Sequence, residues 1–215
     1  MEIKHLIVGS LLTNCYILIS KGEALAIDPG GGLKRILKEI GEAKLKYIIL
    51  THYHWDHLLA APKLKKYTGA KILIQEGEKD FIKFEIDQFL KEGEEIKFGG
   101  DSLKVIHTPG HTKGSICLLG DDFIFTGDTI FEDGYGRTDL PGGSQKDLEN
   151  SLLKLQKILK PGMEIYPGHG HIFELYPNVY THMADSAEKS IISVYVCKYG
   201  QNNKRGKVEM DTAYL

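Results

Sequence analysis

The segment "YIILTHYHWDH", residues 47–57, constrains this chain more than any other feature. Its first four residues are apolar and have the length and composition of a buried strand. Directly after them, three of the nine histidines and one aspartate lie close together: His52, His54, Asp56 and His57. Burying three imidazoles and a carboxylate without partners is costly, so we interpret the segment as a strand that ends in a metal-binding loop.

The same pattern recurs at the ends of three later predicted strands. His111 follows the apolar part of "SLKVIHTPG", Asp128 follows "DFIFTG", and His169 follows "MEIYPG". In layered α/β proteins, loops outside the strand ends converge on one site. The chain therefore offers seven candidate ligands: His52, His54, Asp56, His57, His111, Asp128 and His169.

Seven candidate ligands are more than one metal ion requires. A single tetrahedral ion needs only four, whereas two ions that share a bridging carboxylate would use the whole set. Imidazole and carboxylate ligands suit zinc, iron or manganese. We therefore expect two divalent metal ions, with zinc as the first choice and iron or manganese as alternatives.

Predicted strands and helices alternate along the chain, which is typical of an α/β fold. Apolar runs bounded by turn residues predict strands at 14–20, 24–28, 46–50, 70–75, 102–108, 115–120, 122–127 and 163–167. Helical periodicity predicts helices at 32–41, 56–67, 78–93 and from about Ser144, where "SQKD" is typical of a helix start. In the 78–93 helix we expect three phenylalanines to pack in the core, with the wall of a substrate groove as the alternative.

Length, charge and cysteine usage exclude several classes of protein. The 215 residues are enough for one α/β domain with its own core. A formal net charge of −2 offers no general attraction to nucleic acid or to anionic lipid, so we expect neither as a partner. The apolar runs are strand-sized, which predicts no membrane span. Three widely spaced cysteines, Cys15, Cys117 and Cys197, and a start without a signal-peptide layout predict a cytoplasmic location.

Four segments in a fixed order carry a resemblance to a known family. "THYHWDH", "HTPGHTKGS", "TGDTIF" and "YPGHG" resemble the metallo-β-lactamase-fold hydrolases, in particular the short glyoxalase II-like branch, which is related to persulfide dioxygenases. The resemblance covers roughly residues 3–172. It implies a four-layer αββα sandwich, in which two mixed β-sheets are flanked by helices. We expect this domain at residues 1–178, followed by a C-terminal extension at 179–215 that contains a predicted strand at 190–199.

The resemblance also implies how the candidate ligands divide between two ions. One ion would be held by His52, His54 and His111. The other would be held by Asp56, His57 and His169, with Asp128 bridging the two ions. Asp56 would have a catalytic role besides, because it would accept or orient the proton of an attacking metal-bridging hydroxide or water.

Comparison within the superfamily narrows the expected activity. True β-lactamases of this fold are usually exported and carry cysteine in place of Asp128, and flavin-dependent diiron members tend to have Glu in place of His54. RNA-processing members carry basic surfaces or extra domains that a chain of this length and charge lacks. We therefore expect a hydrolase of a small-molecule thiol ester, similar to hydroxyacylglutathione hydrolase.

Two alternatives remain open at the level of sequence. The first is a mononuclear iron persulfide dioxygenase, whose ligands would map onto His52, His111 and Asp128. The second is a metal-stabilised binding protein without catalysis, although structural zinc sites are usually closed and rich in cysteine.

Residues outside the ligand set have weaker predicted roles. Arg137 is a candidate for binding a substrate carboxylate, and a structural ion pair with Asp139 is its alternative role. We expect His5, His107 and His182 to be structural. His171 is expected near the site without binding metal.

Overall fold

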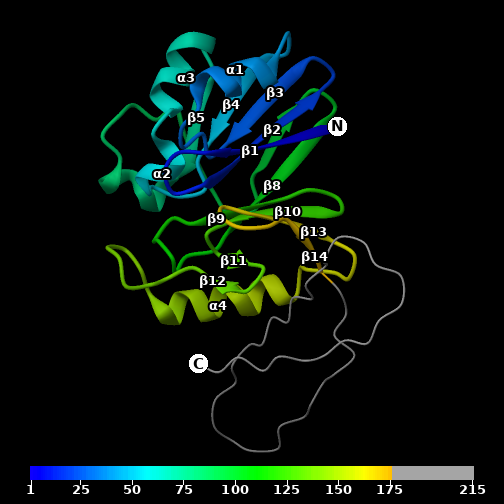
Figure 1. Ribbon diagram of the computed structural model, residues 1–215. Coiled ribbons are helices and arrows are strands. Elements are labelled where there is room, and N and C mark those ends of the chain that lie inside the picture. Colours follow the sequence, from blue (N-terminus) through cyan, green and yellow to red (C-terminus); the bar gives the residue numbers. More distant parts are fainter. Residues whose placement is uncertain (176–215) are drawn as a thin grey trace, which may run out of the picture.

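The computed structural model describes residues 1–175. The predicted strand at 190–199, the extension at 179–215, Cys197 and His182 lie outside the described residues. Figure 1 shows two sheets stacked face to face, with helices on both outer faces. The expected four-layer αββα sandwich is therefore confirmed.

The first sheet has six strands in the order β1-β2-β3-β4-β5-β6. They are β1 (Glu2–Val8), β2 (Thr13–Ser20), β3 (Glu23–Ile27), β4 (Lys44–Ile49), β5 (Lys71–Gln75) and β6 (Gln88–Leu90). β1 and β3 pair antiparallel with β2, whereas β3 to β6 pair in parallel. The sheet is therefore mixed.

The second sheet also has six strands, in the order β14-β13-β10-β9-β8-β7. They are β7 (Glu95–Phe98), β8 (Asp101–His107), β9 (Ile116–Leu119), β10 (Phe123–Gly127), β13 (Glu164–Pro167) and β14 (Phe173–Glu174). Only the β10–β13 pair is parallel, so this sheet is mixed as well. A small hairpin of β11 (Ile130–Phe131) and β12 (Gly134–Tyr135) follows β10.

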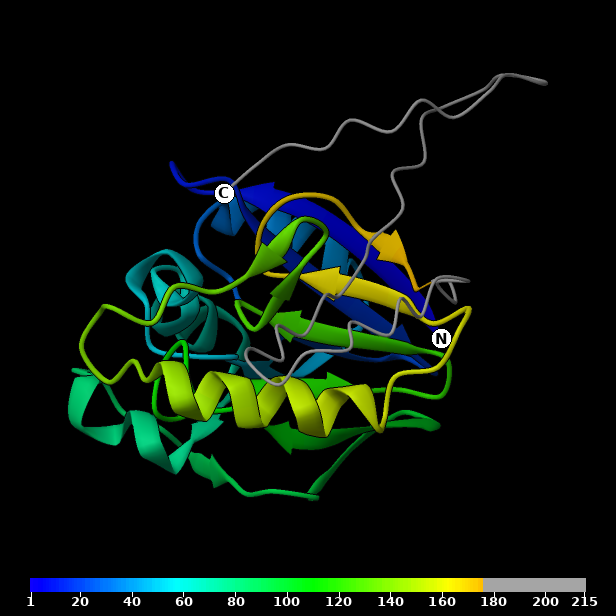
Figure 2. The ribbon, with the colours of Figure 1, turned by 90° about the horizontal axis from the view of Figure 1, so that it is seen from below.

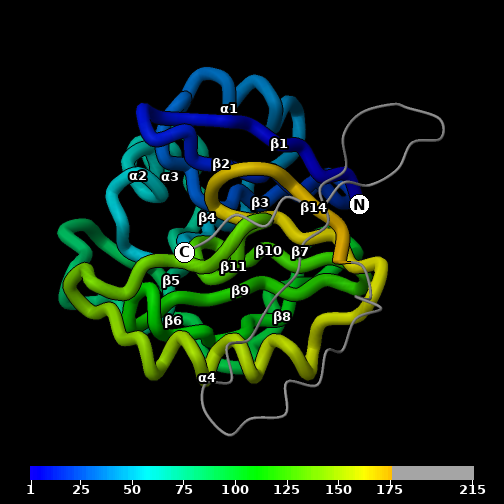
Figure 3. The backbone as a smooth tube through the Cα atoms, turned by 60° about the horizontal axis from the view of Figure 1, so that its bottom comes forward, coloured from blue at the N-terminus to red at the C-terminus, as the bar shows by residue number. Residues whose placement is uncertain are grey.

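The helices cover the two outer faces of the sandwich. α1 (Leu33–Ile40) and α3 (Ala61–Thr68) lie on the first sheet, and the short α2 (Trp55–Leu58) precedes α3. α4 (Gln145–Gln156) crosses the outer face of the second sheet, as Figure 2 shows. In Figure 3 the tube places α1 and α3 on one outer side and α4 on the opposite side.

Alternation of side chains along β2 explains how one strand serves two apolar layers. Cys15 and Ile17 face the layer beneath α1 and α3, whereas Tyr16 and Leu18 face the layer between the two sheets. Successive residues of a strand point to opposite faces, so a strand buried on both faces is apolar throughout. Within residues 1–175, every predicted strand overlaps an observed one.

The helices predicted at 32–41 and from Ser144 are confirmed. α1 buries Ile36 and Ile40 and ends at Gly41, whose φ of 60° suits glycine. The Ser144 hydroxyl accepts a hydrogen bond from the Asp147 backbone N–H at the start of α4.

Two helix predictions are wrong in their extent or type. The helix predicted at 56–67 is divided into α2 and α3, with Pro62 in the first turn of α3. Proline lacks an N–H and clashes with the preceding turn, so it begins a new helix instead of continuing one.

The predicted helix at 78–93 does not form. The structure has a 3₁₀ helix, η1 (Glu76–Phe81), then an extended segment that leads into β6. In this segment Ile82, Phe84 and Ile86 are half-buried and alternate with exposed charged residues, which is the period of an extended chain. Pairing with β5 supplies backbone hydrogen bonds that the sequence pattern did not indicate.

Candidate metal centre

The seven candidate ligands lie on loops at one end of the sandwich. His52 and His54 follow β4, Asp56 and His57 lie in α2, and His111 lies in the turn between β8 and β9. Asp128 directly follows β10, and His169 follows β13. The expected convergence of these loops is confirmed by the distances between the side chains.

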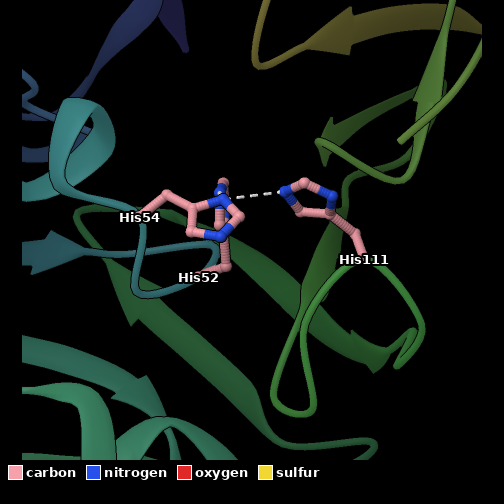
Figure 4. Close-up of side chains that lie close together, drawn as sticks. All are labelled: His52, His54 and His111. Carbon is pink, nitrogen blue, oxygen red and sulfur yellow. Dashed lines mark hydrogen bonds between the residues drawn. The ribbon is translucent and has the colours of Figure 1, made fainter. Parts of the chain in front are cut away.

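Three imidazoles form the first half of the centre. His54 Nδ1 lies 3.1 Å from His52 Nε2 and 2.9 Å from His111 Nε2. Figure 4 shows His52 and His54, from the loop after β4, facing His111 from the opposite loop. Ligands around a tetrahedral ion with bonds of about 2.1 Å are roughly 3.4 Å apart, so these nitrogens are spaced as ligands of one ion would be.

Asp56, His57 and His169 form the second half. His169 Nε2 lies 3.1 Å from Asp56 Oδ2 and 3.2 Å from His57 Nε2. His57 Nε2 and Asp56 Oδ2 are 3.4 Å apart. One oxygen and two nitrogens therefore converge on a second point.

Asp128 lies between the two halves. Its Oδ2 is 3.5 Å from His111 Nε2 and 3.7 Å from His169 Nε2, so one carboxylate oxygen faces both groups. Its Oδ1 is 3.4 Å from His57 Nε2.

An unpartnered carboxylate oxygen shows that the described residues fit a bound cation. Asp128 Oδ1 is buried and has no hydrogen-bond partner among residues 1–175. Three groups of ligand atoms lie close enough to hold an ion: His52, His54 and His111; His52, His57 and Asp128; Asp56, His57 and His169. Buried acceptors that converge without donors are costly unless a cation compensates them.

Asp28 supports this centre, although the sequence analysis did not identify it. Its Oδ2 accepts hydrogen bonds from His57 Nδ1 at 2.9 Å and from the Thr51 hydroxyl at 2.6 Å. Its Oδ1 accepts the Thr51 backbone N–H at 2.8 Å. Because a carboxylate can only accept, Nδ1 of His57 carries a proton, and Nε2, which faces the cluster, is the nitrogen that would bind a cation. The sequence feature that could have identified Asp28 is its position directly after β3, which matches the position of Asp128 directly after β10.

Other ligands are oriented in the same way. The Thr51 hydroxyl, which donates to Asp28, accepts from His52 Nδ1 at 3.0 Å. His111 Nδ1 donates to the Arg137 carbonyl at 2.7 Å. The Thr13 hydroxyl donates to Asp56 Oδ2 at 2.9 Å.

Burial and neighbouring charges divide the histidines into two electrostatic classes. Burial, and then the neighbouring imidazoles, lower the pKa of His52 well below its usual value and that of His54 to about 4. Burial also lowers the pKa of His111, so these three rings are neutral, which is the form that binds metal. At His57 burial acts in the same direction, but the carboxylates of Asp128 and Asp28 outweigh it and raise the pKa to about 9.

The Arg137 side chain makes an ion pair with Asp139. Its Nε and Nη2 each donate to Asp139 at 2.7 Å, and both side chains are exposed. The ion pair considered as an alternative therefore forms, and the Arg137 carbonyl, not its guanidinium, contacts the centre. Substrate binding by Arg137 stays a prediction.

The other histidines among residues 1–175 do not belong to any group of ligand atoms that could hold an ion. His5 Nε2 contacts Asn14 Oδ1 at 2.8 Å, and His107 Nε2 contacts the Lys113 carbonyl at 3.0 Å. His171 is exposed.

Comparison with known proteins agrees with this geometry. Residues 8–171 match the sequence profile described as the Metallo-beta-lactamase superfamily. The protein belongs to this superfamily. Its members are metal-dependent hydrolases in general, and the His and Asp clusters described above fit that chemistry.

Individual relatives are similar over most of the chain. The probable polyketide biosynthesis zinc-dependent hydrolase BaeB of Bacillus velezensis is 35% identical over 161 residues, which cover 72% of either chain. The hydroxyacylglutathione hydrolase GloC of Haemophilus influenzae is 35% identical over 79% of this chain and 91% of its own. The crystal structure of ETHE1 from Myxococcus xanthus has a TM-score of 0.72 and 29% identity, covering 81% of this chain and 80% of its own.

No helix within residues 1–175 is both long enough and apolar enough to cross a membrane.

Proposed function

We propose that this protein is a binuclear metal-dependent hydrolase of small-molecule thioesters. His52, His54 and His111 would hold one divalent ion, and Asp56, His57 and His169 a second, with Asp128 shared between them. Zinc is the expected metal, since BaeB is named as a zinc-dependent hydrolase and the ligands are those zinc prefers. The observation that carries the proposal is Asp128 Oδ2, which faces ligand nitrogens of both halves at 3.5 and 3.7 Å.

The chemistry follows from the ligand set and its supporting hydrogen bonds. When bound, such ions lower the pKa of water to about 7 and polarise a carbonyl oxygen. Asp56, held by the Thr13 hydroxyl, presents a carboxylate that can only accept, so it orients the proton of an attacking water. A thiolate leaving group with a pKa of roughly 8.5 needs little protonation, so the proposed reaction does not require a strong acid at the centre.

Similarity to GloC supports the thioester as the substrate class, because that relative is named as a hydroxyacylglutathione hydrolase. We propose a hydroxyacyl thioester of a small thiol as the first substrate to test.

One observation favours a second candidate, an iron-dependent persulfide dioxygenase. His52, His111 and Asp128 alone would make a two-histidine, one-carboxylate triad, with Asp128 Oδ2 at 4.0 Å from His52 Nε2 and 3.5 Å from His111 Nε2. In that enzyme His54, Asp56, His57 and His169 would have no ligand role.

Two assays run in parallel separate these candidates. We expect thiol release from a hydroxyacyl glutathione thioester at the same rate with and without oxygen. Oxygen uptake with glutathione persulfide, supported by iron alone and without thiol release, would overturn the hydrolase proposal.

A ligand of the second half gives an independent comparison. We expect His169→Ala to reduce thioester hydrolysis by about 100-fold or more, which is about 2.7 kcal/mol of transition-state stabilisation. His171→Ala, an exposed histidine two residues later, is the matched control and should keep full activity.

A further inference from the structure

His169 is the least restrained of the ligands in the second half of the centre. Its side chain is 28% exposed, whereas those of Asp56 and His57 are 7% and 0% exposed. His57 has Asp28 behind its ring, but among residues 1–175 the Nδ1 atom of His169 has no hydrogen-bond partner. A ligand ring without such support must be positioned by its backbone.

Asn14 in β2 holds that backbone on both sides of His169. Its side-chain amide Nδ2 donates to the carbonyls of Pro167 and Gly170, each at 3.0 Å. Its backbone N–H donates to the Gly168 carbonyl at 2.7 Å. Residue 14 therefore binds three carbonyls of the loop from Pro167 to Gly170, more than 150 residues away in sequence.

The loop has little freedom to move against the centre. A Cβ at Gly168 would lie 2.2 Å from Asp128 Oδ1 and 2.8 Å from His57 Cε1, so only glycine fits there. The loop backbone therefore packs directly on the ligands of the second half, and a shift of the loop would carry His169 away from Asp56 and His57.

His5 binds the other end of the Asn14 amide, whose Nδ2 must point at the loop because the Pro167 and Gly170 carbonyls can only accept. His5 Nε2 lies 2.8 Å from Asn14 Oδ1, and the His5 ring stacks on Tyr16 with the ring centroids 5.2 Å apart. With Oδ1 directed at His5, both hydrogens of Nδ2 point at the loop, so both donors and the acceptor oxygen of the buried amide have partners. Neither aspartate, which lacks the donors, nor alanine can replace this arrangement.

We propose that Asn14, bound to His5 on one side and to the loop on the other, is a positioning residue that sets the occupancy of the second metal position by holding the His169 loop. This inference rests on the proposed ligand role of His169. Asn14 touches neither ion nor substrate; it acts through the carbonyls of the loop. Its neighbour Thr13 supports Asp56 of the same half, so the start of β2 serves two of the three ligands there.

The test is a zinc titration against a competing chromophoric chelator, fitted to two binding steps. For Asn14→Ala we expect the second equivalent to bind about 10–100-fold more weakly, with the first equivalent changed by less than about threefold. A merely structural defect would weaken both steps together. Asn150→Ala, an exposed asparagine on α4, is the matched control and should bind both equivalents normally.

A second variant guards against a folding defect in Asn14→Ala. His5→Phe keeps an aromatic ring beside Tyr16 but removes the hydrogen bond to Asn14, and we expect the second step alone to weaken, by about 3–10-fold. If the wild type binds two ions and both variants bind the second ion as tightly as the wild type does, the role of Asn14 is overturned and the proposed function is left intact. A wild type that binds only one ion would instead overturn the binuclear proposal and this inference with it.

Discussion

Asp28→Asn tests how far the carboxylate behind His57 controls metal binding. The new amide can take two orientations, and in each its NH₂ group would face a donor instead of an acceptor. In one orientation these donors are His57 Nδ1 and the Thr51 hydroxyl, and in the other the donor is the Thr51 backbone N–H. The φ of Asp28 is 50°, a region that asparagine tolerates well, so the substitution adds no backbone strain. The perturbation is therefore confined to the hydrogen bonds.

The expected magnitude follows from the bond that is lost. A hydrogen bond to a charged group contributes about 1.5–3 kcal/mol, and removal of a partner behind a ligand typically weakens metal binding by about 10–100-fold. We expect the Kd of the second zinc ion to rise by that factor, equal to about 1.4–2.7 kcal/mol. The first ion should be affected less, because His52 is linked to Asp28 only through Thr51.

Competition with a chromophoric chelator measures both steps, and Asp121→Asn, an exposed carboxylate, is the control. If Asp28→Asn binds the second ion as tightly as the wild type, the orientation of His57 by Asp28 does not contribute to the centre and the reasoning is refuted.

Three further predictions concern the bridging residue, the metal and a buried acid. Asp128→Ala should lower both zinc content and thioester hydrolysis, the latter by at least about 100-fold, and full activity would show that the two halves work without it. Removing metal with a chelator should lower the Tm, and adding zinc should restore it, because a metal ion that binds only the folded state stabilises that state. An unchanged Tm would contradict the proposal that these residues bind metal. Burial raises the pKa of Glu78 above its usual value of 4.5, so folding disfavours the ionised carboxylate. As the pH rises from 4.5 to the raised pKa of the folded state, the unfolding free energy of the wild type should therefore fall relative to that of Glu78→Gln. Urea titrations of the metal-free proteins measure this difference, and a difference independent of pH would show that Glu78 folds ionised without cost.

The ligand cluster could be anticipated from sequence because strand ends are visible in the residue pattern. His52, His111 and His169 each follow an apolar run, and a layered fold brings such ends together. The pattern identifies candidates but not their supporting partners. Asp28 has no histidine near it in sequence, and its contact with His57 exists only because β3 and β4 are adjacent in the sheet.

The errors have equally specific causes. Ile82, Ile86 and Leu90 recur at helical spacing, yet Ile82, Phe84 and Ile86 recur at strand spacing, and only the free edge of β5 decides between them. The contacts of Asn14 could not be predicted either, because its partners Pro167, at the end of β13 in the other sheet, and Gly170, in the loop after it, are more than 150 residues away in sequence.

The central claim is that seven side chains hold two ions with Asp128 between them. Anomalous X-ray diffraction at the zinc absorption edge, from crystals grown without chelator in the presence of zinc, tests it directly. We expect two peaks about 3.5–4 Å apart, one among His52, His54 and His111 and one among Asp56, His57 and His169. A single fully occupied peak held by His52, His111 and Asp128, with His169 turned away, would contradict the claim.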